Sequence, residues 1–331
     1  MSKILITGAS GFIGSFIVEE ALRKGFDVWA AMRKSSSKSY LTDSRINFIE
    51  MNLADKQSLV SLFEKNKFDY IVHAAGVTKC SKAEDFYKVN TLGLVNLVSA
   101  LQETAMPIKR FVFISSLSVC GPVRENRPYT DITIDDKHAP DTLYGISKDK
   151  AEEFLVSQKD FPSIILRPTG VYGPREKDYF LMAKSIKQHV DFAVGFKPQS
   201  LTFVFVQDLV NAVFLALDKG TLRKGYFVSD GKTYSSRTFS DLIRKELGNP
   251  WLLRITAPIW MLRLLSKGGQ LIGQITGKMP VLNNDKFNIM KQRNWQCDIR
   301  PTIEELGYKP EFPLEKGVPI AMKWYKDNGW I

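Results

Sequence analysis

A tyrosine and a lysine four positions apart indicate acid–base chemistry. Tyr144 and Lys148 belong to the run Tyr-Gly-Ile-Ser-Lys, and in a helix this spacing puts both side chains on one face. A free tyrosine has a pKa of about 10, too high for efficient proton transfer near neutrality. Because a nearby ammonium favours the phenolate, Lys148 should lower that pKa. We therefore predict that Tyr144 exchanges a proton with a carbonyl or alcohol oxygen.

A group of hydroxyls precedes this pair in the chain. The run Ile114-Ser115-Ser116-Leu117-Ser118 ends an apolar segment that has the pattern of a buried strand. The carboxyl ends of parallel strands line the ligand crevice of such sheets. Ser116 is therefore the predicted partner that orients the substrate oxygen, with Ser118 as the second candidate.

The first helix is preceded by a glycine-rich turn. Gly8, Gly11 and Gly14 follow a short apolar run and open a segment with helical periodicity. The first glycine permits a tight turn, the second lets backbone amides approach a pyrophosphate, and the third allows close packing of helix on strand. With a helix N-terminus behind it, this turn predicts a dinucleotide site. Its other members are Ser10, Phe12 and Ile13.

The end of the second predicted strand bears on which dinucleotide binds. NAD sites usually place an acid here to bind the ribose 2′-hydroxyl, and the first acid after this strand is Asp43, which lies too far along. Arg33 and Lys34 offer charge-assisted hydrogen bonds to a 2′-phosphate instead. The sequence therefore favours NADP(H), with NAD(H) possible, and Lys148 should also hold the nicotinamide ribose.

The elements that must position these residues alternate along the first half. Continuous apolar runs separated by amphipathic segments predict a parallel sheet covered on both faces, hence a doubly wound α/β (Rossmann) fold. The expected strands are 3–7, 27–32, 46–51, 70–74, 110–116 and 163–167, and the expected helices are 12–24, 57–65, 84–104 and 143–159. We expect a dinucleotide-binding domain over 1–173, to which 203–230 returns. A smaller, interleaved substrate-binding region should comprise 174–202 and 231–331.

Composition excludes several classes of protein. Three cysteines and three histidines without metal-ligand spacing predict neither disulfides nor a metal site. No signal peptide is visible, so we expect a cytoplasmic setting. The net charge of +11 comes without a nucleic-acid motif. It suits an anionic cofactor or an anionic membrane surface, or is simply a solvated basic surface.

Taken together, these motifs resemble the extended short-chain dehydrogenase/reductase family, also called the NAD-dependent epimerase/dehydratase family. The resemblance covers nearly the whole chain and implies catalytic roles for Ser116, Tyr144 and Lys148. It also implies cofactor contacts from residues that follow later strands: Ala74, Ala75, Gly76, Asn90, Pro168, Thr169 and Val171. We expect Ser118, Thr78 and Tyr172 to contact the substrate.

Departures from the family pattern narrow the expected reaction. Asn52-Leu53 stands where an Asp-Leu pair commonly meets the adenine, and Asn52 can still bond its amino group. Leu117-Ser118 replaces the Asp-Glu of sugar dehydratases, and Cys120 replaces a frequent tyrosine. With Arg33, these features are most similar to the 3β-hydroxysteroid dehydrogenase, dihydroflavonol reductase and bacterial 3-ketosphinganine reductase-like branch.

The segment 251–275 is the most informative part of the second half. It is mostly apolar, with a narrow polar stripe formed by Arg263, Lys267, Gln270 and Gln274. Its three charges and adjacent glycines argue against a membrane-spanning helix. It fits an interfacial helix that gives peripheral membrane contact, a lid over an apolar substrate, or a helix hairpin packed on the core.

The sequence thus predicts an NADP(H)-dependent enzyme that interconverts a ketone and a secondary alcohol on a small, apolar, lipid-like molecule. One alternative is a nucleotide-sugar epimerase or reductase, with Arg175, Lys177 and Arg237 contacting a diphosphate. A second is a non-catalytic dinucleotide-binding subunit. The resemblance also implies a homodimer that associates through 84–104 and 143–159.

Overall fold

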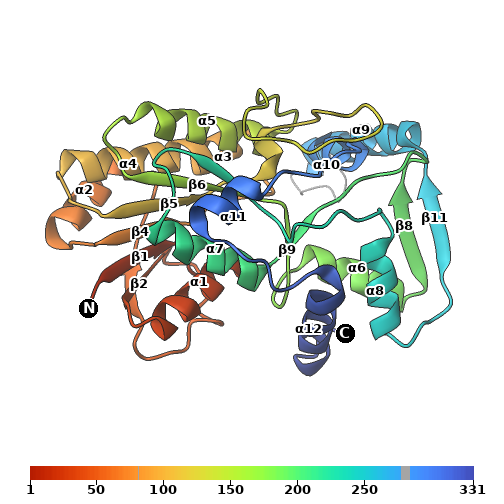
Figure 1. Ribbon diagram of the computed structural model, residues 1–331, viewed down its shortest axis with the longest axis horizontal. Helices are drawn as coiled ribbons and strands as arrows, with labels where there is room; N and C mark the ends of the chain where they lie inside the picture. The colour runs from red at the N-terminus through yellow and green to blue at the C-terminus, as the bar shows by residue number, and fades with distance from the viewer. Residues whose placement is uncertain (81, 277–283) are drawn as a thin grey trace.

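The computed structural model describes residues 1–80, 82–276 and 284–331, and a seven-stranded parallel sheet lies at its centre (Figure 1). The strand order is β10-β6-β5-β4-β1-β2-β3. The bounds are β1 (Lys3–Thr7), β2 (Asp27–Met32), β3 (Asn47–Glu50), β4 (Tyr70–His73), β5 (Arg110–Ile114), β6 (Ser163–Pro168) and β10 (Gly225–Val228). The predicted α/β fold with a doubly wound sheet is confirmed.

Helices cover both faces of this sheet, as continuous apolar strands require. One face packs against α1 (Phe12–Arg23), α7 (Val206–Asp218) and α11 (Arg300–Leu306). The other packs against α2 (Lys56–Lys65), α4 (Gly93–Glu103) and α5 (Leu143–Ser157). Ile4, Leu5 and Ile6 show the consequence, since alternate side chains of β1 enter opposite cores and all three are fully buried.

The helix expected over 84–104 is divided into three parts. It consists of α3 (Ala83–Phe86), a π-helical stretch η1 (Tyr87–Leu92) and then α4. A π-helical stretch adds a residue to one turn and is frequent at functional sites. Here it contains Asn90, one of the predicted site residues.

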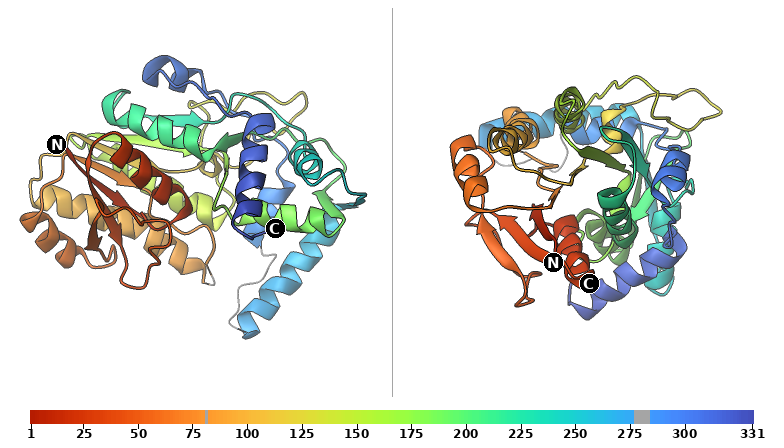
Figure 2. Two further views of the ribbon diagram at one scale, coloured as in Figure 1. Left: turned by 90° about the horizontal axis from the view of Figure 1, so that it is seen from below. Right: turned by 60° about the vertical axis from the view of Figure 1, so that its left-hand side comes forward.

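A second lobe lies beyond the carboxyl end of the sheet (Figures 1 and 2). Its members are α6 (Asp178–Lys187), β8 (Val190–Val194), α8 (Thr238–Glu246), β11 (Leu253–Ala257), α9 (Ile259–Thr276), α10 (Asn284–Lys291) and α12 (Leu314–Asp327). A two-stranded sheet of β7 (Gly170–Tyr172) and β9 (Phe203–Phe205) stands between the lobe and the main sheet. Among the described residues, no helix is long and apolar enough to cross a bilayer.

The chain crosses between the two parts more than once. After α6 and β8 it returns to the large sheet, where β10 pairs with β6. It returns again at α11, which packs on β10 and α7 although the sequence assigns it to the substrate-binding region.

The helical interpretation of 251–275 is wrong for its first part. Residues Leu253–Ala257 form β11, which pairs in parallel with β8, and α9 begins only at Ile259. The side chains of Lys267 and Gln270 and those of 271–276 lie outside the described residues, so of the predicted polar stripe only Arg263 is described.

Candidate active site

The turn between β1 and α1 is closed tightly around glycine. Gly8 has φ +68°, and a Cβ there would lie 2.6 Å from the backbone nitrogen of Ala75. A Cβ on Gly14 would collide with the carbonyl of Gly8, so the helix sits directly on the turn. Gly11, at the N-cap of α1, has no side chain to cap the first N–H groups of that helix. These amides can receive a phosphate, which fits the predicted dinucleotide.

An open cleft of about 360 Å³ extends from this turn across the carboxyl ends of β1, β2 and β4. The predicted cofactor residues in its wall are Gly8, Ser10, Gly11, Arg33, Asn52, Leu53, Ala74, Ala75 and Gly76. Residues that sequence reasoning missed are Thr7, Ala31, Met32, Ser36, Met51, Ala54, Val77, Lys88 and Val89. Among the described lining residues two are cations and none is an acid, so the cleft suits an anionic ligand.

Other predicted cofactor residues lie beside the cleft. Phe12, Ile13 and Gly14 start α1, and the side chain of Lys34 is exposed outside the cleft wall. Pro168 ends β6 and Thr169 and Val171 follow it, and the Thr169 amide donates to the Val228 carbonyl over 3.1 Å. They border the carboxyl edge of the sheet on the side of the second lobe.

Tyr144 and Ser116 meet at the end of β5. Tyr144 lies in the first turn of α5, whose N-cap Thr142 accepts from the Gly145 amide over 2.9 Å. Ser116 precedes a short 3₁₀ turn, η2 (Leu117–Val119), and its hydroxyl lies near enough to the Tyr144 phenol to lower the pKa of that phenol. The hydroxyls of Ser116 and Ser118 are 3.1 Å apart. The structure thus places three hydroxyls together, as acid–base chemistry on one oxygen requires.

The expected lowering of the Tyr144 pKa by Lys148 is not observed. Burial raises the pKa of Tyr144 to about 12, and only the hydrogen bond from Ser116 opposes that rise. Lys148 is turned toward β5, where its Nζ donates to the Ile114 carbonyl over 2.8 Å. Burial lowers the pKa of Lys148 to about 8, against a smaller opposing effect of Glu152. The phenol is therefore protonated at neutral pH, and the lysine is held in place by the Ile114 carbonyl.

Lys148 reaches the cleft by way of Gly76. A Cβ on Gly76 would lie 3.2 Å from the Lys148 Nζ and equally close to the Asn90 Oδ1. Asn90 accepts from the Val77 amide over 2.8 Å and donates to the Ser147 hydroxyl over 2.9 Å. The π-helical stretch thus ties the turn after β4 to α5.

A buried ion pair holds α5 against the large sheet. Glu152, one turn after Lys148, accepts from Arg167 Nη2 over 2.6 Å and from Arg167 Nε over 3.0 Å. It also accepts from the Ser115 hydroxyl. Glu152 and Arg167 are only 2% and 7% exposed, so α5 is locked against the ends of β5 and β6.

A neutral histidine lies under the glycine turn. His73 is fully buried, and its Nδ1 is 2.8 Å from the Thr7 hydroxyl. Burial, helped by the charge of Lys148, lowers the pKa of His73 to about 3. The Ala75 amide donates to the same Thr7 hydroxyl over 3.3 Å. This link fixes the two turns that form the cleft, and the sequence interpretation did not include it.

The sequence model of the NAD dependent epimerase/dehydratase family matches residues 4–228. The chain belongs to this family. The resemblance inferred from its motifs, to the extended short-chain dehydrogenase/reductase branch, is therefore confirmed.

Its relatives act on two kinds of molecule. A UDP-glucose 4-epimerase from Vibrio cholerae is 30% identical, covering 95% of this chain and 93% of that protein. A sterol-4-alpha-carboxylate 3-dehydrogenase from Candida albicans is 25% identical, covering 99% of both. WbmG from Bordetella bronchiseptica, solved in complex with NAD, has the same fold, with a TM-score of 0.78 at 24% identity over 99% of this chain and 94% of that one. These relatives are dehydrogenases and epimerases, but membership of the family does not choose between sugar and sterol.

The predicted substrate residues separate in space. Ser118 stays beside Ser116, and Thr78 is exposed in the segment after β4. Tyr172 instead lies fully buried in the core of the second lobe, against Phe205 and Phe239. It has no exposed surface to offer a substrate.

The cations proposed for a diphosphate are mostly engaged elsewhere. Arg175 donates to Ser15 and Glu19 of α1 over 2.9 and 2.6 Å, and its guanidinium lies 4.3 Å from the Phe16 ring centroid. Arg237 forms an ion pair with Asp191 at 2.6 Å. Lys177 is exposed at the start of α6.

One contact between the second lobe and α5 could not be predicted from any sequence motif. The Asp285 carboxylate of α10 accepts from the amides of Leu143 and Tyr144 over 3.0 and 3.3 Å. It thereby caps the first turn of α5 from the second lobe, 141 residues away in sequence. Among the described residues, no group of His, Cys, Asp and Glu could hold a metal ion.

Proposed function

We propose that this protein is an NADP(H)-dependent oxidoreductase that interconverts a ketone and a secondary alcohol on an apolar, lipid-like substrate, such as 3-ketosphinganine or a steroid. The observation that carries the proposal is the meeting of the Tyr144 phenol with the Ser116 hydroxyl. This pair stands at the carboxyl edge of the same sheet whose glycine turn and cleft fit a dinucleotide.

The serine and tyrosine side chains have different roles at the substrate oxygen. In the reductive direction, Ser116 and Ser118 hold the ketone oxygen and Tyr144 donates its phenolic proton to it. With its pKa raised to about 12, Tyr144 carries that proton throughout the neutral range. Lys148, fixed beside Gly76, holds the ribose next to the reacting centre. A bound nicotinamide supplies the hydride, or accepts it in the reverse direction.

The preference for NADP(H) rests on the charge of the cleft. Arg33 lies in the wall after β2, and the described lining residues include no acid that would bond a 2′-hydroxyl or repel a 2′-phosphate. The cleft glycines, Asn52, Leu53, Ala74, Ala75 and the residues after β6 would hold the rest of the cofactor.

Two observations favour an apolar substrate over a nucleotide sugar. Arg175 and Arg237 are held by Glu19 and Asp191, so neither is free for a diphosphate. Leu117 and Ser118 occupy the place of the dehydratase Asp-Glu pair. The nucleotide-sugar alternative stays open because of the 30% identity to the Vibrio cholerae epimerase. A non-catalytic role is opposed by the intact Ser116, Tyr144 and Lys148.

A homodimer through η1, α4 and α5 belongs to the same proposal. Exposed apolar side chains on η1 and α5 are those that a partner copy would cover: Tyr87, Leu92, Leu143, Ile146 and Val156.

The test is an NADPH-oxidation screen across long-chain 3-ketones, 3-ketosteroids and UDP-glucose. We expect stoichiometric NADPH consumption with a lipid ketone and loss of turnover by about a thousandfold in Tyr144→Phe, with NADPH binding unchanged. Interconversion of UDP-sugars without net cofactor consumption would instead establish the epimerase. Turnover that survives in Tyr144→Phe would refute the assignment of the proton donor.

A further inference from the structure

The small β8–β11 sheet has its polar face inside and its apolar face outside. In a parallel pair, residues in register point to the same side. Val190 pairs with Leu253, Phe192 with Ile255, and Val194 with Ala257, so one side of this sheet is entirely apolar. Asp191 pairs with Arg254 on the opposite side.

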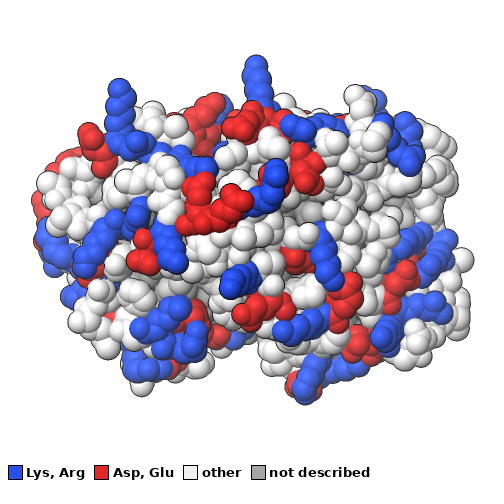
Figure 3. All heavy atoms as spheres, in the orientation of Figure 1, with Lys and Arg blue, Asp and Glu red and all other residues white. Residues whose placement is uncertain are grey.

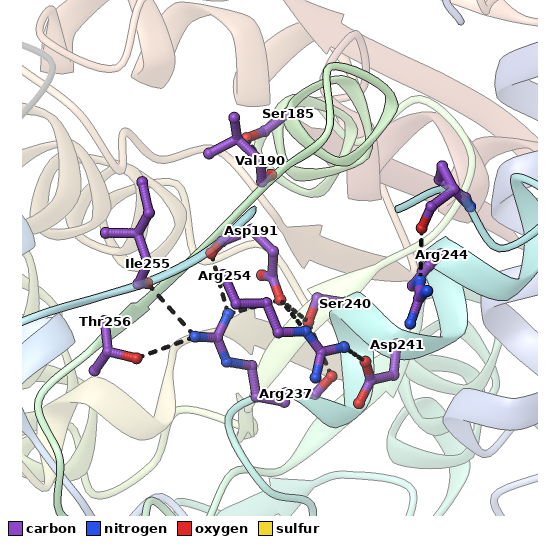
Figure 4. A network of polar contacts seen from close by, with 11 residues as sticks. Ser185, Val190, Asp191, Arg237, Ser240, Asp241, Arg244, Arg254, Ile255 and Thr256 are labelled. Carbon is purple, nitrogen blue, oxygen red and sulfur yellow. Dashed lines mark hydrogen bonds and ion pairs between the residues drawn. The ribbon is translucent and has the colours of Figure 1, made fainter. Parts of the chain in front are cut away.

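The polar side faces the protein. Asp191 is only 3% exposed and is held by Arg237 at 2.6 Å, Arg254 at 3.7 Å and the Ser240 hydroxyl at 3.2 Å (Figure 4). Arg237 also donates to the Thr256 hydroxyl over 3.1 Å. Because α8 covers this polar face, the apolar face of the sheet is turned toward solvent at the edge of the molecule (Figure 1).

The apolar surface continues from the sheet onto α9. Gly195, directly after β8, packs against the Ile259 side chain at the start of α9, and one side of α9 is buried through Leu262 and Ser266. On its other side the described residues Trp260, Leu264 and Leu265 are exposed. The large exposed side chains of this region, which we call the outer apolar face, are Phe192, Phe196, Trp251, Leu253, Trp260, Leu264 and Leu265. Each is more than half exposed, with Phe196 reaching 77%.

The described charges that border the outer apolar face are basic. Arg263 on α9 and Lys197 after β8 are both exposed, and the sequence has no acid in 192–207 or in 255–276. Elsewhere basic and acidic side chains are mixed, as the view in Figure 3 shows. Two tryptophans and two phenylalanines beside cations match the boundary between lipid headgroups and acyl chains.

We infer that the outer apolar face docks on an anionic lipid bilayer, with Phe192, Leu253 and the exposed side of α9 entering the headgroup region. A second copy of the chain fits less well, because a twofold dimer would bring these cations against one another. Other exposed apolar side chains, on η1 and α5, are available for a dimer.

This inference extends the proposed function, because a bilayer is where a lipid-like ketone resides. The chain continues from α9 to α10, whose Asp285 caps the helix that carries Tyr144. The docking face therefore lies close in sequence to the element that touches the active site.

The test is co-sedimentation of the full-length protein with vesicles of phosphatidylcholine alone or with 30% phosphatidylglycerol, a test composition. We expect binding to the anionic vesicles only, and a fall in partition of about tenfold or more for Phe192→Ser/Leu253→Ser. Arg263→Gln should weaken binding by about fivefold. The matched controls are Leu222→Ser and Lys67→Gln, exposed residues of the nucleotide-binding half, which should bind like the parent.

Two further measurements keep the outcomes apart. Equal binding of the parent and Phe192→Ser/Leu253→Ser, or no binding at all, would overturn the inference. So would a change in oligomeric state of that variant in analytical ultracentrifugation, since the face would then serve a second copy. Turnover of a short, water-soluble ketone should be unaffected by these substitutions. If no ketone is reduced by the parent while vesicle binding persists, the proposed function fails and the docking face stands.

Discussion

The large sheet and the β8–β11 sheet distribute polarity in opposite ways. Strands of the large sheet are apolar on both faces, and the cleft lies at their carboxyl edge. The β8–β11 sheet buries Asp191 and exposes Phe192. The first arrangement makes a rigid platform for chemistry. The second leaves an exposed apolar surface that a membrane or another molecule would have to cover. We therefore expect substitutions in the large sheet and its helices to have the largest effects on stability and catalysis.

The strongest single effect on folding is expected at Glu152. Glu152→Ala leaves the Arg167 guanidinium buried without its partner, which should lower the free energy of unfolding by about 3–5 kcal/mol. Urea denaturation measures this. Glu153→Ala, on the exposed side of the same helix, is the control and should change stability little. Equal effects from both would show that the buried pair does not brace the platform.

Cofactor choice should respond to one cation and not to its neighbour. Arg33→Ser should weaken NADPH binding by about 10–100-fold, because a charge-assisted hydrogen bond is lost, and should leave NADH binding unchanged. Isothermal titration with both cofactors measures this. Lys34→Ser, outside the cleft wall, should behave like the parent. Parallel losses for NADPH and NADH would contradict the assignment of Arg33 to the 2′-phosphate.

The buried ammonium of Lys148 should lower the free energy of unfolding. Its pKa is lowered from 10.5 to about 8, so between these values the unfolded chain binds more protons than the folded one. The free energy of unfolding therefore rises with pH across that interval. Below pH 8 the full destabilisation by the buried ammonium is present. Lys148→Met should abolish turnover yet raise stability at pH 7 by about 1–3 kcal/mol.

Thermal unfolding of Lys148→Met at pH 7 and at pH 10 checks this, with the exposed Lys150→Met as control. The gain should shrink at the higher pH. A gain independent of pH would show that the buried ammonium is not its source.

The smallest effect is expected where the two parts meet. Asp285→Ala removes the acceptor for the amides of Leu143 and Tyr144, so kcat should fall a few-fold, with the KM for NADPH and the melting temperature unchanged. Asp285→Asn should restore most of kcat, and Asp218→Asn is an exposed control. If Asp285→Ala alters NADPH binding instead, the contact supports the cleft and does not position the phenol.

Local sequence patterns predicted the large sheet well because each of its buried strands is a short apolar run. Apolar runs place six of its strands within a few residues, and the glycine turn lies where its spacing indicates. The β11 strand was missed for a physical reason, since Leu253 and Ile255 point outward and Arg254 inward, the reverse of the usual pattern. The helical periodicity of 84–104 also hides the π-helical stretch that contains Asn90.

Contacts between segments that are distant in sequence could not be predicted from local sequence patterns. The carboxylate of Asp285 caps α5 only because α10 is folded onto it, and Tyr172 is buried by side chains as distant as Phe239. The direction of the Lys148 side chain, toward the Ile114 carbonyl, likewise depends on how α5 packs on β5. The spacing of Tyr144 and Lys148 predicted their shared helix but not the balance of burial and charge that sets the phenol's pKa.

The place of β10 has a consequence for how the polypeptide is synthesised. This strand hydrogen-bonds to β6, yet 56 residues separate Pro168 from Gly225, and α6, β8, β9 and α7 are made in between. During translation β6 therefore emerges as an open edge and waits for its neighbour, a state in which unpaired backbone groups invite wrong partners. The nucleotide-binding half cannot close before part of the second lobe has left the ribosome, so the two parts of the enzyme mature together.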